Sequence, residues 1–157
     1  MPTEIKFTIG GFEEDCHDVR AQEGMVKYEF RPAGSDRETV RIIATPSAKQ
    51  WSYFWRRVEQ IGVWDWQPKY WVFVMDGTQW ELELNLTDRT LTSIGSNSYP
   101  GCEGRDYTLR CEFGRLLLAL EQLIGQDVRI ATRPRIMPIL ELRTGKAAQS
   151  TGLDFEI

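Results

Sequence analysis

Residues 70–100 read YWVFVMDGTQWELELNLTDRTLTSIGSNSYP, and this stretch decides the fold. Residues 70–75 are almost purely apolar, which is typical of a central strand covered on both faces, or of one covered by helices on one face and by the C-terminal tail on the other. Asp76 and Gly77 then favour a hairpin turn, and residues 80–86 alternate apolar and polar side chains as a half-buried strand does. A short turn and a third strand follow. The stretch therefore predicts a sheet of three strands joined by two tight turns.

Three strands and a helix are expected before this stretch, and the first strand lies at residues 5–9. The alternating segment MVKYEFR, residues 25–31, and residues 38–44 predict an antiparallel hairpin, because their connection is too short for a parallel crossover. Thr45 suits the N-cap of the following helix and Pro46 suits its first position. Gly62 is expected to end this helix. Its apolar face consists of Trp51, Phe54, Trp55, Val58 and Ile61.

A second helix is expected after the strand at residues 90–94. It should begin at Asp106 or Thr108 and end at Gly125. Its apolar stripe consists of Phe113, Leu116, Leu117, Leu120, Leu123 and Ile124. Gly114 would cost about 1 kcal/mol inside a helix relative to alanine. Either another part of the backbone comes close to Gly114, or the helix begins later.

Together these patterns predict an α+β fold with two layers, an antiparallel sheet and two helices packed on one of its faces. Residues 51–60 resemble residues 113–122, and each segment follows two strands. Two ββα-type repeats would explain this similarity, and so would the shared constraints on amphipathic helices. A chain of 157 residues suits about one domain. We expect a single α+β domain at residues 1–143 and a mobile C-terminal tail at residues 144–157.

Composition excludes several classes of function. The net charge of −4 argues against a nucleic-acid-binding protein, which normally has clustered Lys and Arg. The N-terminal residues do not have the pattern of a secretory signal, and no long apolar run predicts a membrane span. Cys16, Cys102 and Cys111 are an odd number at unrelated spacings, so neither a disulfide framework nor a zinc site is expected. These features predict a cytoplasmic protein with reduced thiols, no cofactor and no metal.

The acidic segment that follows the predicted N-terminal strand at residues 5–9 is expected to be a loop, residues 12–24. Within it, residues 13–18 read EEDCHD and could be interpreted as a metal or catalytic cluster. Adjacent side chains diverge, so contiguous residues chelate poorly. His17 is the only histidine, and any Cys–His nucleophile must use it. A solvated acidic loop is therefore the favoured interpretation, and a small metal-dependent or Cys/His-based hydrolase is the alternative.

Two places carry candidate binding residues. Trp64 and Trp66 lie in the connector after the first helix, where they could anchor a partner or cap the core. Asn97, Ser98 and Tyr99 lie in a polar loop before the second helix, a position that often carries function. The alternative is a helix-entry turn in which Asn97 and Ser98 hydrogen-bond to backbone groups. With no catalytic residue identified, the sequence predicts a non-enzymatic binding or protein-interaction module. A regulatory or toxin-neutralising subunit belongs to the same class and predicts a stable complex with another protein.

The chain also resembles a known pattern. An Asp-Gly turn, a Trp-bearing strand and the loop GSNSYP at residues 95–100 precede an apolar helix. This combination is similar to small uncharacterised bacterial α+β domains, in which a G-x-N-x-Y-P loop precedes the final helix. The resemblance covers about residues 70–125. It implies a bacterial cytoplasmic origin and a non-enzymatic role, and it carries no functional residues.

Overall fold

The computed structural model describes residues 3–34, 36–73, 77–104, 106–125 and 130. The strands are β1 (Glu4–Gly10), β2 (Cys16–Gln22), β3 (Met25–Arg31), β4 (Val40–Ala44), β5 (Lys69–Trp71), β6 (Gln79–Asn85) and β7 (Thr90–Ser96). The helices are α1 (Ala48–Ile61), the short 3₁₀ helix η1 (Val63–Asp65) and α2 (Glu112–Ile124).

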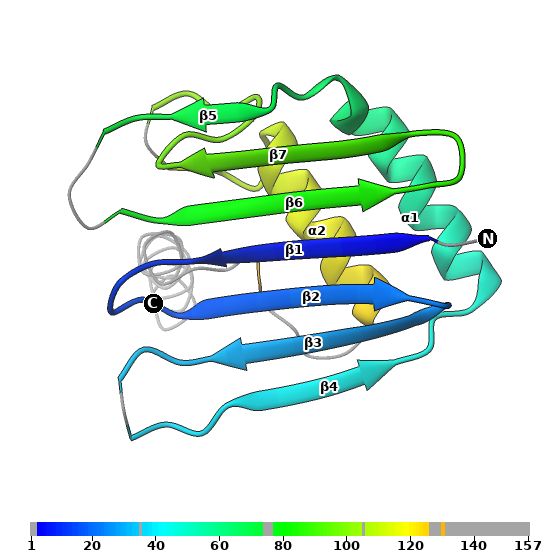
Figure 1. The fold of residues 1–157 in the computed structure, drawn as a ribbon, viewed down its shortest axis with the longest axis horizontal. Helices are drawn as coiled ribbons and strands as arrows, with labels where there is room; N and C mark the ends of the chain where they lie inside the picture. Colours follow the sequence, from blue (N-terminus) through cyan, green and yellow to red (C-terminus); the bar gives the residue numbers. More distant parts are fainter. Residues whose placement is uncertain (1–2, 35, 74–76, 105, 126–129, 131–157) are drawn as a thin grey trace, which may run out of the picture.

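The strands form one sheet in the order β4-β3-β2-β1-β6-β7-β5. Every neighbouring pair is antiparallel except β5 and β7, which are parallel. Both helices cross behind this sheet in the view of Figure 1. The α+β class and the mostly antiparallel sheet are therefore as predicted. The predicted boundary between residues 143 and 144, and the whole of the predicted tail, lie outside the described residues.

One face of the sheet is packed against the helices, and we call it the packed face. Its buried side chains alternate along the strands, as one-sided packing requires. They are Ile5, Phe7, Ile9, Val19, Ala21, Val26, Tyr28, Trp80, Leu82, Leu84 and Leu91. All six predicted stripe residues of α2 are buried, whereas α1 buries Phe54, Val58 and Ile61 and leaves Trp51 and Trp55 half-buried. Phe113 lies among aromatic rings, with centroids 5.0 Å from Trp80 and 4.8 Å from Tyr99.

The helix ends differ in part from those predicted. The N-cap of α1 is Ser47 rather than Thr45, because Ser47 forms a reciprocal capping box with Gln50. Gly62 ends α1 in a left-handed conformation with φ +81°, as predicted.

The second helix starts later than predicted, with Cys111 as its N-cap, and ends as predicted at Gly125. Gly114 lies in its first turn, where an added Cβ would collide with the carbonyl of Thr108. Both explanations offered for Gly114 are therefore correct. The chain passes so close to α2 that only glycine fits at this position.

The predicted loop at residues 12–24 is wrong, because it contains the strand β2. This strand pairs with β1 on one side and β3 on the other, with Val19 opposite both Phe7 and Tyr28. Its sequence, CHDVRAQ, offers only Val19 and Ala21 as apolar residues, so local alternation was weak. Pairing with two neighbours supplies the stability that β2 lacks by itself.

The predicted central strand at residues 70–75 and its hairpin with β6 are also wrong. The strand there is the three-residue β5, which lies at the sheet edge and pairs in parallel with β7 through Tyr70 and Gly95. The two neighbours of β6 are β1 and β7. The strand β1 occupies the position that the hairpin required, and residues 74–76 of the expected turn lie outside the described residues.

Two cysteines are paired, so the expectation of reduced thiols is wrong for both of them. Cys102 and Cys111 form a disulfide with their Cα atoms 5.1 Å apart, and Cys16 is free. The bond closes the loop that leads into α2. The spacing of the cysteines does not predict this pairing. The two cysteines meet because the chain turns back on itself before α2.

Candidate functional site

The second face of the sheet, which we call the open face, is not covered by any helix or strand among the described residues. It looks toward the viewer in Figure 1. Its side chains are the alternate, polar ones of the same strands, such as Lys6, Asp18 and Glu81. Ion pairs cross it from strand to strand, with Lys6 Nζ 3.4 Å from Glu81 Oε1 and 3.6 Å from Glu83 Oε1.

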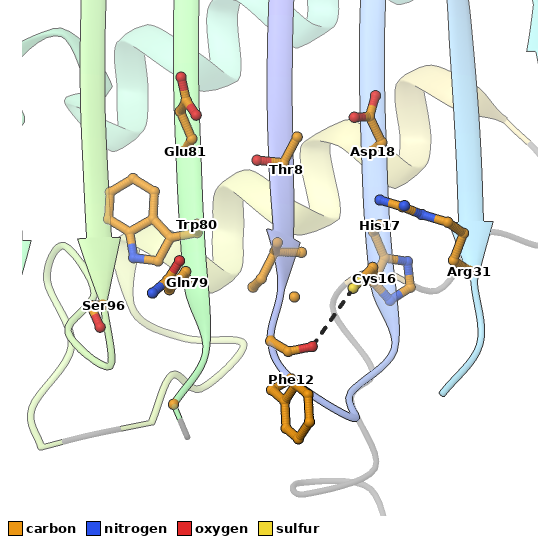
Figure 2. A pocket seen from close by; sticks show the side chains of 14 residues that line it. Thr8, Phe12, Cys16, His17, Asp18, Arg31, Gln79, Trp80, Glu81 and Ser96 are labelled. Carbon is orange, nitrogen blue, oxygen red and sulfur yellow. Dashed lines mark hydrogen bonds between the residues drawn. The ribbon is translucent and has the colours of Figure 1, made fainter. Parts of the chain in front are cut away.

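A pocket of about 650 Å³ lies on the open face, where β1 ends and β2 and β6 begin (Figure 2). The polar residues of the open face that line it come from β1, β2, β3, β6 and β7 and are Thr8, Cys16, Asp18, Arg31, Gln79, Glu81 and Ser96. His17 and Trp80, whose side chains belong to the packed face, line it as well. Thr8 is the cross-strand partner of both Asp18 and Glu81, so two carboxylates flank one hydroxyl.

Glycines shape this end of the pocket. A Cβ added at Gly10 would collide with the Sγ of Cys16, and one added at Gly11 would lie 2.7 Å from the carbonyl oxygen of Gly77. The end of β1 therefore packs closely against the Cys16 side chain, and the turn after it against the Gly77 backbone. The Cys16 thiol turns back to this turn, with its Sγ 3.5 Å from the carbonyl oxygen of Glu14.

The charges in the pocket have both signs. Asp18 Oδ1 accepts a hydrogen bond from Arg20 Nε at 3.0 Å, and this bond raises the pKa of Arg20 above its ordinary value. Arg31 pairs with Glu29 at 3.7 Å. A ligand of this pocket therefore meets carboxylates and a guanidinium at short range, and most of them are already paired with neighbours.

Large exposed apolar side chains lie at the pocket and on the strand beside it. Phe12 lines it and is 74% exposed. Trp71 is 57% exposed and lies opposite Ser96 of the pocket wall, and Phe73 is 78% exposed two residues further on. We call Phe12, Trp71 and Phe73 the aromatic rim. Sequence reasoning missed them because it placed two of the three in a buried central strand.

The predicted binding tryptophans have different surroundings. Trp66 is buried, and its Nε1 donates to Glu112 Oε2 at 3.0 Å. Trp64 is half-buried, with its ring stacked 6.3 Å from Trp55 and the Arg89 guanidinium 4.1 Å from its centroid. Trp64 thus holds the turn between β6 and β7 against α1. Of the two tryptophans, only Trp64 presents some surface to a partner.

The predicted loop residues are mostly packed. Asn97 is buried in a left-handed conformation with φ +53°, and its Oδ1 accepts from the Thr78 N–H at 2.9 Å. Tyr99 is buried against Phe113, and the Ser98 carbonyl accepts from Trp80 Nε1 at 2.9 Å. The structure thus brings this loop to the core around Phe113 and leaves only Ser98 partly exposed.

The side chains of the hydrolase hypothesis are separated by the sheet. Cys16 and His17 are both among the residues that line the pocket, but as neighbours in β2 their side chains lie on opposite faces of the sheet. His17 is buried on the packed face, with Nδ1 2.7 Å from the Tyr28 hydroxyl. Burial raises the pKa of Tyr28 well above its ordinary value of 10.0, and the charges of Glu121 and Asp15 act in the same direction. Within the described ranges, no group of three or more His, Cys, Asp or Glu side chains could hold a metal ion.

Comparisons with known proteins found no family model that matches this chain and no matching curated protein. Neither helix in the described part of the chain is long and apolar enough to cross a bilayer.

Proposed function

We propose that this protein is a non-enzymatic protein-interaction module that binds its partner with the open face of the sheet, around the pocket and the aromatic rim. The observation that carries the proposal is the aromatic rim itself. Burying Trp71 or Phe12 in an interface would remove a large apolar area from water, and such aromatic residues dominate binding energy at protein interfaces. Exposed apolar patches mark protein-interaction sites, and aromatic residues are enriched in interfaces relative to the rest of the surface.

The charges of the open face favour a protein as the partner. Glu81 and Glu83 on β6 face the same side as Lys27 and Arg31 on β3, so the surface carries both signs. A nucleic acid would favour a surface of one positive sign, because its phosphates are neutralised by Lys and Arg. A protein surface with its own mixed charges can match both signs, which supports orientation and specificity.

A regulatory or toxin-neutralising subunit remains within this proposal, since both predict a stable complex with another protein. The resemblance to small bacterial domains supports a bacterial, cytoplasmic setting for it. The earlier candidates Trp64 and Ser98 stay in the proposal as secondary contacts, because they keep some exposure.

Sheet order supports the finer architectural proposal of two ββα-type repeats with both helices on one face. The order β4-β3-β2-β1-β6-β7 is symmetric about the boundary between β2 and β1, and it exchanges β3-β4 with β6-β7. Each of these hairpins is followed in sequence by one helix. Sequences of related chains test this: a duplication requires the two units to be more similar than unrelated ββα segments, and no excess similarity would overturn it.

The functional experiment compares three variants in capturing a partner from the native host. Trp71→Ala with Phe12→Ala should weaken capture by roughly thirtyfold or more, as expected for the loss of two anchors. Because both side chains are exposed, the melting temperature should stay nearly unchanged.

Tyr53→Ala is the matched control, since Tyr53 is an exposed aromatic residue on α1, away from the pocket lining. It should leave capture unchanged. Trp64→Ala tests the secondary site separately. If the rim variant binds as the wild type does while the Trp64 variant loses the partner, the open face is not the binding surface.

A further inference from the structure

The two edges of the sheet are built differently. The strand β5 has three residues, follows Pro68 and contains Lys69. Short length, proline and lysine are features that keep an edge strand from pairing with another chain. The strand β4 has five residues, VRIIA, and contains neither lysine nor proline. Among the described residues its only strand neighbour is β3.

The exposed side chains of β4 are apolar as well. Ile43 is 65% exposed and Val40 is 46% exposed. The one charged side chain, Arg41, donates to Glu29 Oε2 at 3.1 Å, so its charge is compensated within the chain. The edge thus presents a row of backbone N–H and C=O groups flanked by apolar side chains and by no uncompensated charge.

We propose that β4 pairs antiparallel with β4 of a second copy of this chain, so that two seven-stranded sheets join into one continuous sheet. A twofold axis through the middle of β4 places Ile42 opposite Ile42 of the second copy. The same register pairs Val40 with Ala44 and Arg41 with Ile43. The β4 strand of each copy then pairs with the unpaired edge of the other, which makes a closed twofold interface.

This register suits both faces of the joined sheet. On the packed face, Val40, Ile42 and Ala44 continue the row that begins across the strand pair with Phe30, Tyr28 and Val26. On the open face, Arg41 meets an isoleucine rather than another arginine, which avoids repulsion between like charges. A second copy is favoured over a foreign strand because the sequence of β4 is complementary to itself in this register.

The inference does not depend on the proposed function. None of the residues of β4 lines the pocket, and none belongs to the aromatic rim. A dimer through β4 would leave the open face of both copies available, and so it would present two partner sites on the same side of one extended sheet.

The test is the mass of the full chain in solution, measured by light scattering and sedimentation over a roughly hundredfold range of concentration. The expected mass is twice the chain mass of 18.2 kDa. Ile43→Lys introduces at this exposed position the residue that edge strands use against pairing. It should weaken dimerisation roughly tenfold or more while circular dichroism stays that of the folded chain.

Trp71→Lys is the matched control at the opposite edge, and it should leave the dimer intact. Hydrogen exchange provides a second measurement, because the outward amides of β4 should be protected in the wild type and lose protection in Ile43→Lys.

A monomer at every concentration would overturn the inference. With β4 amides still protected, such a monomer would indicate that the chain covers this edge itself. A dimer that survives both Ile43→Lys and Val40→Lys would equally overturn it, because another surface would then join the copies. A β4 amide row that becomes protected only on adding a protein partner would assign the edge to that partner instead.

Discussion

Alternate residues of the same strands form the two faces of the sheet, yet the two faces differ in burial and in their contribution to stability. On the packed face, Phe7 and Leu82 lie opposite each other and are fully buried. One residue away, Lys6 and Glu81 lie on the open face, with their side chains about a third exposed. Burying a large apolar side chain contributes about 1.5–3 kcal/mol, whereas an exposed ion pair contributes about 0–1 kcal/mol. Stability is thus concentrated on the packed face, and the side chains of the open face contribute little to it.

The largest effect is expected where this contrast is sharpest, at two neighbouring positions of β6. Leu82→Ala should lower the free energy of unfolding by about 2–5 kcal/mol, because it leaves a cavity between the sheet and the helices. Glu81→Ala, one residue away on the open face, should change it by less than about 0.5 kcal/mol. Urea unfolding of both variants measures the difference. Equal losses would mean that the open face is also packed in solution.

The second effect concerns the loop that completes the packed face. Tyr99 and Tyr107 of this loop pack on Phe113, with centroids 4.8 and 5.3 Å away, and the bond between Cys102 and Cys111 closes it. Since a loop of this length loses limited entropy on closure, opening the disulfide should cost about 2–3 kcal/mol.

Thermal unfolding with and without a reductant measures this cost, and Cys16→Ser is the control, because Cys16 forms no disulfide. An unchanged melting temperature would mean that the loop is held by its tyrosines alone.

Thiol titration of protein taken directly from cells adds a test of location. One free thiol would contradict the proposed reducing cytoplasm, and three would agree with it.

Local pattern alone could predict the elements whose side chains repeat with a clear period. The strands β3, β6 and β7 and the apolar stripe of α2 follow from alternation or helical spacing in a few adjacent residues. The strand β2 could not be predicted in this way, because only Val19 and Ala21 supply apolar alternation in it, and its order comes from pairing with β1 and β3 on either side. The apolar pattern of residues 70–75 fits a central position in a sheet and an edge position equally well. The pattern alone therefore does not distinguish the two positions.

The candidate site was harder to predict than the fold, for a related reason. Exposure of Trp71 depends on where β5 stops and on which strand lies beside it, and both are set by β7 and β1. Conversely, the polar and aromatic side chains of Asn97 and Tyr99 made them candidate binding residues, but these side chains make their contacts inside the protein. The Asn97 Oδ1 accepts a hydrogen bond from the Thr78 backbone N–H, and the Tyr99 ring packs beside Phe113.

A third, smaller effect tests the polar pair on the packed face. Tyr28→Phe removes the hydroxyl that is 2.7 Å from His17 Nδ1 and should cost about 1 kcal/mol at neutral pH. The folded-state pKa of Tyr28 is raised, so its contribution is fully present below the unfolded pKa of about 10 and is lost as pH rises above it. The wild type should then lose up to about 1.4 kcal/mol per pH unit more than the variant does.

The difference between wild type and Tyr28→Phe should therefore shrink between about pH 10 and about pH 11 and then reverse. Urea unfolding at several pH values measures it. A difference that stays constant across this range would show that Tyr28 reaches water in the folded state, and that the packed face is open near His17.

The smallest effect is expected on the open face itself. Lys6→Met keeps the apolar stem of the side chain but removes the charge that lies between Glu81 and Glu83. Because all three side chains are about a third exposed, water and salt screen their interactions, and the loss should be about 0.5 kcal/mol or less. At about 1 M salt, where screening acts within about 3 Å, even this difference should fade. A loss of several kcal/mol that salt does not reduce would require these charges to be buried in the native protein. It would show that something covers the open face even without an added partner, and the contrast between the two faces would then hold only for the isolated chain.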